Sequence, residues 1–355
     1  MIKTMRTAVV SALLFVSFGC GSGAPNGAIP YAMLQGTKVS TWMYQIQDLN
    51  DKAVGTLAAT AYDMMVIEPG FNLQEDPYDT AKIVTALATK PNGDKRVLLA
   101  YIDIGQAEDY RDYWQTNWVA PTKHKHGSPD FLITIDPDGW SGNYPVAYWD
   151  ARWKSIWLGE EGIIAKLVAY GFDGVYLDWV EAYDDEKVMA YARQKGVDAQ
   201  KEMLAFIREI KEKAKAKNPN FVIVAQNAPY LLDDDPKTYA AIIDAIATED
   251  TWYYGEGDAD WDDKGAGDLH GGERHDEGYS TEERIKQSQK YLQRGIPVLT
   301  VDYCVSKKHA ERVYRVSREQ GFVPIVTRVS LSRLTQTPPP EFSHARAAQT
   351  IHKAH

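Results

Sequence analysis

Six acidic or amide side chains follow apolar, β-branched runs of the chain. They are Glu68, Asp103, Asp178, Asn227, Glu249 and Asp302. Parallel strands end at one face of a barrel or sheet, so we expect these side chains to meet there. Burying charge without a partner is costly, and such a ring indicates a ligand site. For any single member, a helix N-cap or a turn remains an alternative role.

Paired carboxylates suit the cleavage of glycosidic bonds, because one protonates the leaving oxygen while the other attacks the anomeric carbon or activates water. Metal-dependent hydrolysis normally needs a histidine cluster, and none of the eight histidines lies at an expected strand end. His124 and His126 lie in one long connection, and His270 and His275 in another, where solvated side chains are favoured over a surface metal site. We therefore expect no metal and no cofactor.

The pattern of elements indicates what must position these carboxylates. Short β-branched runs alternate with helical patterns, which is typical of βα units and a parallel sheet. The expected helices cover residues 50–61, 78–90, 158–170, 185–217, 236–243, 281–294 and 306–319. The expected strands are Val39–Ile46, Asp63–Glu68, Arg96–Ile104, Gly174–Asp178, Phe221–Gln226, Ile243–Thr248, Pro297–Asp302 and Phe322–Thr327. Eight such units predict a (β/α)₈ TIM barrel, with an open doubly wound sheet as the alternative.

Two segments are too long for a bare barrel. Residues 105–157 contain two strand-like runs, Phe131–Asp136 and Pro145–Asp150. Residues 255–278, which we call the acidic segment, hold nine acidic and two basic side chains. Long connections of this kind are uncommon unless they are functional or disordered. Both follow strand ends, so they are expected on the face that carries the carboxylates.

The N-terminus has the features of a secretory signal. Lys3 and Arg6 precede a short apolar run, and Gly19 precedes Cys20, an arrangement similar to a bacterial lipobox. Residues 1–20 are therefore predicted to be a signal peptide, with lipidation at Cys20 and membrane attachment, or else ordinary secretion. We expect an extracytoplasmic protein with a linker over 21–37, a barrel domain over 38–329 and a disordered tail over 330–355.

Composition excludes several classes of protein. Hydrophobic residues make up 44% and charged residues 25%, which excludes global disorder. The net charge of −10 argues against a nucleic-acid partner, which normally needs a basic face. Two cysteines cannot form a disulfide framework, and Cys304 is expected to be a buried, inert thiol. We expect a monomer.

Four motifs, in the order of the expected strands, carry a family resemblance. They are YIDIGQAEDYRDYW (Tyr101–Trp114), GFDGVYLDWVEAY (Gly171–Tyr183), AQNAP (Ala225–Pro229) and ATEDTWY (Ala247–Tyr253). Together they resemble glycoside hydrolase family 114, the endo-α-1,4-polygalactosaminidases, and the resemblance covers roughly residues 38–327. It implies a (β/α)₈ barrel that cleaves α-1,4 linkages in galactosamine-containing exopolysaccharide without a cofactor.

The resemblance also implies roles for individual residues. The catalytic Asp of the family falls on Asp178, as nucleophile or electrostatic partner, and its catalytic Glu falls on Glu249, as general acid/base. That second role requires a raised pKa, which Trp252 and Tyr253 could provide through apolar surroundings. The remaining expected substrate-binding residues are Glu68, Tyr101, Asp103, Glu108, Arg111, Trp179, Asn227, Trp252 and Asp302.

Several of these assignments have alternatives. Arg111 could be a structural ion-pair partner, and Trp179 and Trp252 could pack in the core. Glu68, Asp103 and Gln106 depart from the residues that the family more often shows, a difference that bears on the fine structure of the substrate more than on the type of reaction. A non-catalytic glycan-binding barrel of an exopolysaccharide system is the alternative function. A phosphodiester-cleaving barrel is disfavoured because strand-end histidines are missing.

Overall fold

The computed structural model of the chain describes residues 28–71, 78–273 and 279–342. The expected signal peptide, with Cys20, lies outside these residues. Within the described part, none of the helices has both the length and the apolar character needed to cross a membrane.

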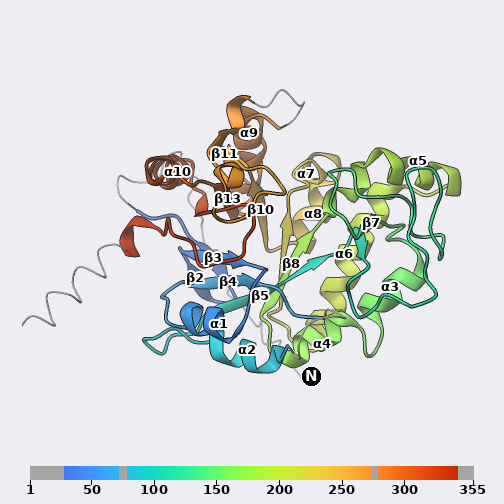
Figure 1. Ribbon diagram of the computed structural model, residues 1–355, viewed down its shortest axis with the longest axis horizontal. Coiled ribbons are helices and arrows are strands. Elements are labelled where there is room, and N and C mark those ends of the chain that lie inside the picture. The colour runs from blue at the N-terminus through green and yellow to red at the C-terminus, as the bar shows by residue number, and fades with distance from the viewer. Residues whose placement is uncertain (1–27, 72–77, 274–278, 343–355) are drawn as a thin grey trace, which may run out of the picture.

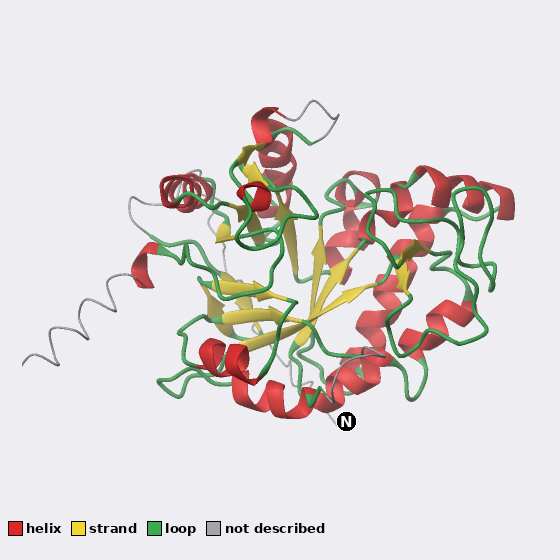
Figure 2. Cartoon of the chain, in the orientation of Figure 1, coloured by secondary structure: helices red, strands yellow, loops and turns green. Residues whose placement is uncertain are grey.

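A parallel sheet of eight strands forms the centre of the molecule, and helices lie around its outside (Figures 1 and 2). The strands are β3 (Trp42–Gln45), β4 (Met64–Ile67), β5 (Val97–Asp103), β8 (Gly174–Asp178), β9 (Val222–Gln226), β10 (Ala245–Glu249), β13 (Val298–Tyr303) and β14 (Val323–Thr327). Their order in the sheet follows the chain. All eight coincide with expected strands, so the (β/α)₈ prediction is confirmed and the open doubly wound sheet is excluded.

The barrel is nearly closed, and side chains join its first and last strands. The indole Nε1 of Trp42 in β3 donates to the carbonyl of Val323 in β14 (2.9 Å). Beyond β14, the carbonyl of Leu331 accepts from the backbone N–H of Ile46 (3.1 Å), just past the end of β3. Gln45 Nε2 donates to the carbonyl of Ser332 (3.0 Å). The segment after the last strand thus covers the end of the first.

Ten α-helices surround these strands in the described part of the chain. They are α1 (Asp51–Ala58), α2 (Thr80–Leu87), α3 (Ala151–Leu158), α4 (Ile163–Tyr170), α5 (Glu186–Lys195), α6 (Ala199–Lys215), α7 (Leu231–Asp234), α8 (Pro236–Ile242), α9 (Thr281–Leu292) and α10 (Lys307–Glu319). The single helix expected over 185–217 is two helices, because Gly196 adopts a left-handed conformation after α5 and Asp198 caps α6. The capping box expected at Ser280 and Glu283 is present.

The long segment 105–157 contributes one short hairpin. Its strands, β6 (Gln106–Glu108) and β7 (Asn143–Pro145), pair antiparallel. The strand-like run 131–136 is not a strand and makes only an isolated bridge, between Leu132 and Val146. Phe131 and Leu132 are nevertheless buried, so their apolar pattern reflects packing rather than a ladder. A second hairpin, β11 (Tyr253–Tyr254) with β12 (Leu269–His270), brackets much of the acidic segment.

Both ends of the described chain are more ordered than we expected. The expected linker over 21–37 contains β1 (Ala32–Leu34), which pairs with β2 (Thr37–Val39). At the other end, residues 330–342 pack on the barrel, and the ring of Phe342 lies 4.6 Å from that of Tyr62. Residues 343–355 of the expected tail lie outside the described residues. Cys304 is fully buried, as expected.

Candidate active site

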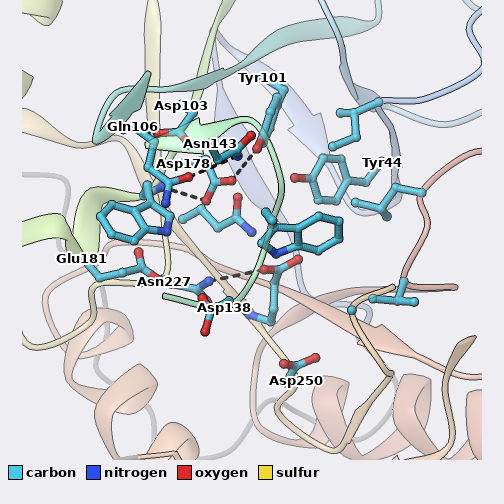
Figure 3. A pocket seen from close by; sticks show the side chains of 18 of the residues that line it. Tyr44, Tyr101, Asp103, Gln106, Asp138, Asn143, Asp178, Glu181, Asn227 and Asp250 are labelled. Atoms are coloured by element: carbon cyan, nitrogen blue, oxygen red, sulfur yellow. Dashed lines mark hydrogen bonds between the residues drawn. The ribbon is translucent and has the colours of Figure 1, made fainter. Parts of the chain in front are cut away.

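A cavity of about 1610 Å³ lies at the carboxyl ends of the strands. Strand ends line its floor. Both long segments contribute to its walls, one through residues 137–141 and the acidic segment through Gly255, Gly257 and Asp258. This confirms the expectation that the two segments share a face with the strand-end carboxylates. Figure 3 shows Asp178, Glu181 and Asn227 around the same space. The volume exceeds the roughly 300–1,000 Å³ of ordinary ligand pockets, so the cavity suits an extended molecule.

Asp178 ends β8 and faces the cavity. Its Oδ2 accepts from the hydroxyl of Tyr101 (2.5 Å), which comes from the adjacent strand β5 (Figure 3). Its Oδ1 accepts from the backbone N–H of Trp179 (2.8 Å), whose left-handed conformation (φ 53°) turns the chain sharply after the strand. Burial and the negative charge of Glu249 raise the pKa of Asp178 to about 7, although the two donors oppose that rise.

Glu249 ends β10 and is held by two polar side chains. Its Oε1 accepts from the hydroxyl of Tyr303, and its Oε2 accepts from Asn227 Nδ2 (3.3 Å). Asn227 Oδ1 in turn accepts from the backbone N–H of Glu249 (3.1 Å), so the two residues are linked reciprocally. Burial and the neighbouring charge of Asp250 raise the pKa of Glu249.

These two carboxylates form an electrostatically linked pair. They sit on β8 and β10 with β9 between them, so their backbones are about 10 Å apart, or two strand spacings. The charge of Glu249 raises the pKa of Asp178. One protonated and one ionised carboxyl group together offer both an acid and a base to a bond lying between them.

A third carboxylate, Glu181, belongs to the same cluster and was missed in the sequence. It lies in the turn after β8, and its Oε2 is buried without a hydrogen-bond partner. Burial and the charge of Asp178 raise its pKa to about 8. The available signal was its position inside the GFDGVYLDWVEAY motif, three residues after Asp178.

Asp103 and Tyr101 come from β5. Asp103 Oδ1 accepts from the backbone N–H groups of Gly105 (3.0 Å) and Gln106 (2.8 Å). Burial and the charge of Asp178 raise the pKa of Asp103 well above its usual range. Asp103 therefore both lines the cavity and fixes the turn that leads into β6.

Arg111 is an ion-pair partner rather than a free cation for substrate. Its guanidinium donates to both oxygens of Glu68 (2.7 and 3.0 Å) and to both oxygens of Glu108 (2.9 and 2.7 Å). All three residues are buried at the cavity wall. Arg111 therefore has the structural ion-pair role that we gave as its alternative. The carboxylate oxygens of Glu68 and Glu108 accept mainly from groups of the protein itself.

The structure places nine of the eleven expected site residues in the lining of this cavity. Trp179 and Asn227 are among them. Trp252 lies outside the lining, since it packs in a separate apolar cluster and its Nε1 donates to Ser317 Oγ (2.6 Å). It therefore does not supply the apolar surroundings expected for Glu249. Asp302 also lies outside, and its Oδ1 accepts from the backbone N–H groups of Trp252 (2.5 Å) and Tyr253 (2.9 Å).

Several lining residues escaped sequence reasoning. Tyr44 of β3 and Tyr303 of β13 lie in strands whose apolar pattern is continuous, so an aromatic residue gives no sign that its hydroxyl reaches a cavity. Trp140 lies in the long segment 105–157, where no periodicity marks its orientation. In the part of the chain that the structure describes, no group of three or more His, Cys, Asp or Glu side chains is arranged to hold a metal ion.

Comparison with known proteins decides the family. The model of glycoside-hydrolase family GH114 matches residues 25–342, most of the chain. The chain belongs to family GH114. An uncharacterized protein of Deinococcus radiodurans is 32% identical to it over 305 residues, which are 85% of this chain and 84% of the relative. An uncharacterized protein of Thermotoga maritima is 30% identical over 219 residues, or 60% of each chain.

Two solved structures share the GH114 fold. The glycoside hydrolase domain of PelA from Pseudomonas aeruginosa is similar with a TM-score of 0.56 and 14% identity, covering 84% of this chain and 98% of that domain. Aspergillus fumigatus Ega3, solved in complex with galactosamine, is similar with a TM-score of 0.54 and 16% identity, covering 88% of this chain and 98% of Ega3. At such identities the likeness establishes the barrel alone. Membership of GH114 supports glycosidase activity.

Proposed function

We propose that this GH114 protein hydrolyses α-1,4-linked galactosamine-containing exopolysaccharide, with Asp178 and Glu249 as its catalytic pair. The observation that carries the proposal is the pair itself, two carboxylates at the ends of β8 and β10 in one large cavity. The resemblance of the motifs around Asp178 and Glu249 to the family's catalytic motifs supports the same assignment.

The charge of the cavity favours an amino sugar as substrate. Among the described residues that line it, twelve are Asp or Glu and two are Arg, and none is Lys or His. One of those arginines, Arg111, is already paired with Glu68 and Glu108. A cavity lined by one sign of charge concentrates ligands of the opposite sign, and free galactosamine is a cation at neutral pH.

The proposed reaction uses the two carboxyl groups in separate roles. Glu249 in its protonated form gives its proton to the glycosidic oxygen as the C1–O bond breaks, and this oxygen leaves as the hydroxyl of the departing sugar. Asp178 in its ionised form either attacks C1 or activates a water that attacks C1. In the first case a water then cleaves the glycosyl ester and gives its proton to the ionised Glu249; in the second case the proton of the water passes to Asp178. Tyr101 and Tyr303 hold the two carboxylates in place through their hydroxyl groups.

The proposal extends to location and assembly. The basic and apolar N-terminus with Cys20 supports an extracytoplasmic protein, lipid-anchored or secreted, that acts as a monomer on polymer outside the cell. A test of anchoring is the mobility and membrane partition of the natural protein beside a Cys20→Ser variant. Equal partition of the two would overturn lipidation at Cys20.

The deciding experiment measures reducing ends released from purified galactosamine polymer by the purified protein and by Glu249→Gln. We expect activity in the unchanged protein and a loss of about 10²- to 10⁴-fold in the variant, because the proton donor is removed. Glu319→Gln, on the exposed surface of α10, is the matched control and should keep full activity.

Two outcomes would overturn the proposal. Full activity in Glu249→Gln would show that the catalytic pair is assigned wrongly. Polymer binding without any hydrolysis would instead establish the glycan-binding barrel.

A further inference from the structure

Exposed aromatic side chains gather at the active-site cavity. Four large aromatic residues are exposed in the described part of the chain, namely Tyr31, Tyr110, Trp140 and Tyr279. The last three line the cavity. Exposed apolar surface concentrated at one place marks an interaction site. Tyrosine and tryptophan present a flat apolar face and a polar edge, which together match the apolar and hydroxylated faces of a sugar ring.

Trp140 is the largest of these side chains and spans two loops. It is 49% exposed and lies between two glycines with left-handed backbone, Gly139 (φ 94°) and Gly142 (φ 91°). A Cβ atom at Gly257 would lie 3.4 Å from its indole ring, so the ring reaches from the segment 105–157 to the acidic segment. The indole therefore lies at the wall of the cavity, where the two long loops meet.

The loop that carries Trp140 is fixed to the floor of the site. Asp136 Oδ1 accepts from the backbone N–H of Trp140 (2.8 Å) and from that of Asp138 (2.8 Å). Asp136 Oδ2 accepts from Gln106 Nε2 (2.6 Å), and the backbone N–H of Gln106 donates to Asp103 (2.8 Å). Figure 3 shows Asp103, Gln106, Asp138 and Asn143 among the side chains of the cavity. A continuous chain of hydrogen bonds thus connects Trp140 with Asp103 beside the catalytic pair.

We propose that Trp140 is the stacking platform of a distal sugar subsite, which binds a pyranose ring of the polymer away from the bond being cleaved. Asp136 is its positioning residue, because a buried carboxylate holds the loop in the orientation that exposes the indole face. The proposal rests on the proposed function and deepens it. It predicts that the protein selects long chains, since only a chain that reaches from Asp178 to Trp140 gains the stacking contact.

The first test compares kcat/KM on α-1,4-galactosamine oligomers from the shortest one cleaved up to long chains. In Trp140→Ala, the ratio of kcat/KM between long and short oligomers should fall about ten-fold, because one ring-stacking contact is removed. Trp140→Phe should keep most of that ratio. Tyr31→Ala, which removes the exposed aromatic side chain that lies away from the cavity, is the matched control and should leave the ratio unchanged. An equal loss on all lengths, or none, would overturn the platform.

The second test concerns Asp136. Asp136→Ala should lower the same ratio, and the double variant with Trp140→Ala should lose little more than Trp140→Ala alone, since both changes remove one contact. If the fold-losses of the two single variants multiply in the double variant, Asp136 does not act through Trp140, and its positioning role is overturned. The thermal unfolding midpoint of each variant identifies a variant that fails to fold, in which case Trp140→Ala carries the test alone.

A binding measurement separates this proposal from the proposed function. Calorimetric titration of Glu249→Gln with the same oligomers reports affinity without turnover. Adding Trp140→Ala should weaken binding of long oligomers about ten-fold more than binding of short ones. Hydrolysis by the unchanged protein with no such length dependence overturns the platform and keeps the glycosidase. Length-dependent binding without hydrolysis keeps the platform and overturns the glycosidase.

Discussion

The two ends of the barrel both carry aspartates, and the two sets have opposite surroundings. Asp63, Asp173 and Asp244 immediately precede β4, β8 and β10, whereas Asp178 and Glu249 end β8 and β10. Each of the first three accepts from a backbone N–H beside or within a neighbouring strand, and each also meets a lysine, at 3.1, 2.7 and 3.6 Å respectively. The strand-end pair meets tyrosine, amide and backbone donors, and neither carboxylate forms an ion pair among the described residues.

The pKa values of Asp63 and Asp178 follow this difference. Burial alone would raise the pKa of Asp63, but its hydrogen bonds with Ser40 and Lys90 lower it below its usual value. For Asp178, burial and the charge of Glu249 outweigh the donors and raise the pKa. Residue type and burial are therefore insufficient to assign a role. Asp63, Asp173 and Asp244, which are paired with lysines, stabilise the fold, whereas Asp178 and Glu249 have no such cation and face the cavity.

The largest expected effect comes from comparing one substitution at each end of the same strand, β8. Asp178→Asn should lower kcat by about 10³- to 10⁴-fold, because the charge at C1 loses its partner. Asp173→Ala, at the start of the same strand, should leave kcat within about two-fold while the protein remains folded. Steady-state kinetics at 25 °C measures both.

The free energy of unfolding should rank the same two variants in the reverse order, with Asp173→Ala the more destabilised of the two. Asp173→Ala leaves the backbone N–H of Leu98 without its partner and should cost about 1–3 kcal/mol in urea unfolding. Lys95→Met is the control, because Lys95 is largely exposed and its ion pair should contribute about 0–1 kcal/mol. A catalytic loss in Asp173→Ala that equals the loss in Asp178→Asn would remove the distinction between the two ends.

A second prediction concerns Arg111, which pairs two carboxylates at the cavity end of the barrel. Arg111→Met should lower the free energy of unfolding by about 3–5 kcal/mol, because Glu68 and Glu108 remain buried without a cation. Arg152→Met, which breaks exposed ion pairs, should cost about 1 kcal/mol or less. Equal losses in the free energy of unfolding for the two variants would mean that burial does not determine how much an arginine contributes to the stability of this protein.

The smallest expected effect is a pH dependence of opposite sign at the two ends. Between pH 3.8 and about 7, the folded protein binds a proton at Asp178 that the unfolded chain releases, so this residue lowers stability as pH rises. Asp178→Asn should therefore raise the thermal midpoint by about 2–4 °C at pH 8 and have little effect at pH 4.

Asp63 provides the matched comparison for this titration. Its lowered pKa means that its contribution is present above pH 3.8 and is lost as the pH falls. Asp63→Asn should therefore lower the midpoint at pH 8, and its effect should shrink in acid. Midpoints of both variants that shift in the same direction at pH 8 would contradict the comparison.

The fold was predictable because its signals are local. Each strand is a continuous apolar run, as burial on both faces of a parallel barrel requires, and glycine or capping residues mark the helix ends. The run 131–136 resembles a strand in the sequence because buried irregular backbone favours the same apolar residue types as a strand. The packed segment 330–342 was missed because its contacts are with residues far away in the sequence. The hairpin over 32–39 is local, but its two strands have only three residues each, which is too short to give a continuous apolar run.

The site was predictable only in part, for a similar reason. Strand-end carboxylates could be read from the sequence, since position along a strand fixes the end of the barrel. Whether such a carboxylate is open to a ligand depends on partners elsewhere in the chain. Asp302 accepts from backbone N–H groups of the loop after β10 and lies outside the cavity lining, whereas Glu68 lines the cavity but is paired with Arg111. Trp140 depends on a hydrogen bond from its own backbone to Asp136, which no periodicity reveals.

The contacts between β3 and β14, where the barrel closes, have a consequence for the biosynthesis of the chain. A ribosome releases the strands in the order in which they pair, so each new strand can join its neighbour as it emerges. The outer edge of β3 stays uncovered until Val323, Leu331 and Ser332 have been made. An uncovered edge strand invites pairing with other chains. The nascent protein therefore depends on the synthesis of residues 323–332 to protect its first barrel strand.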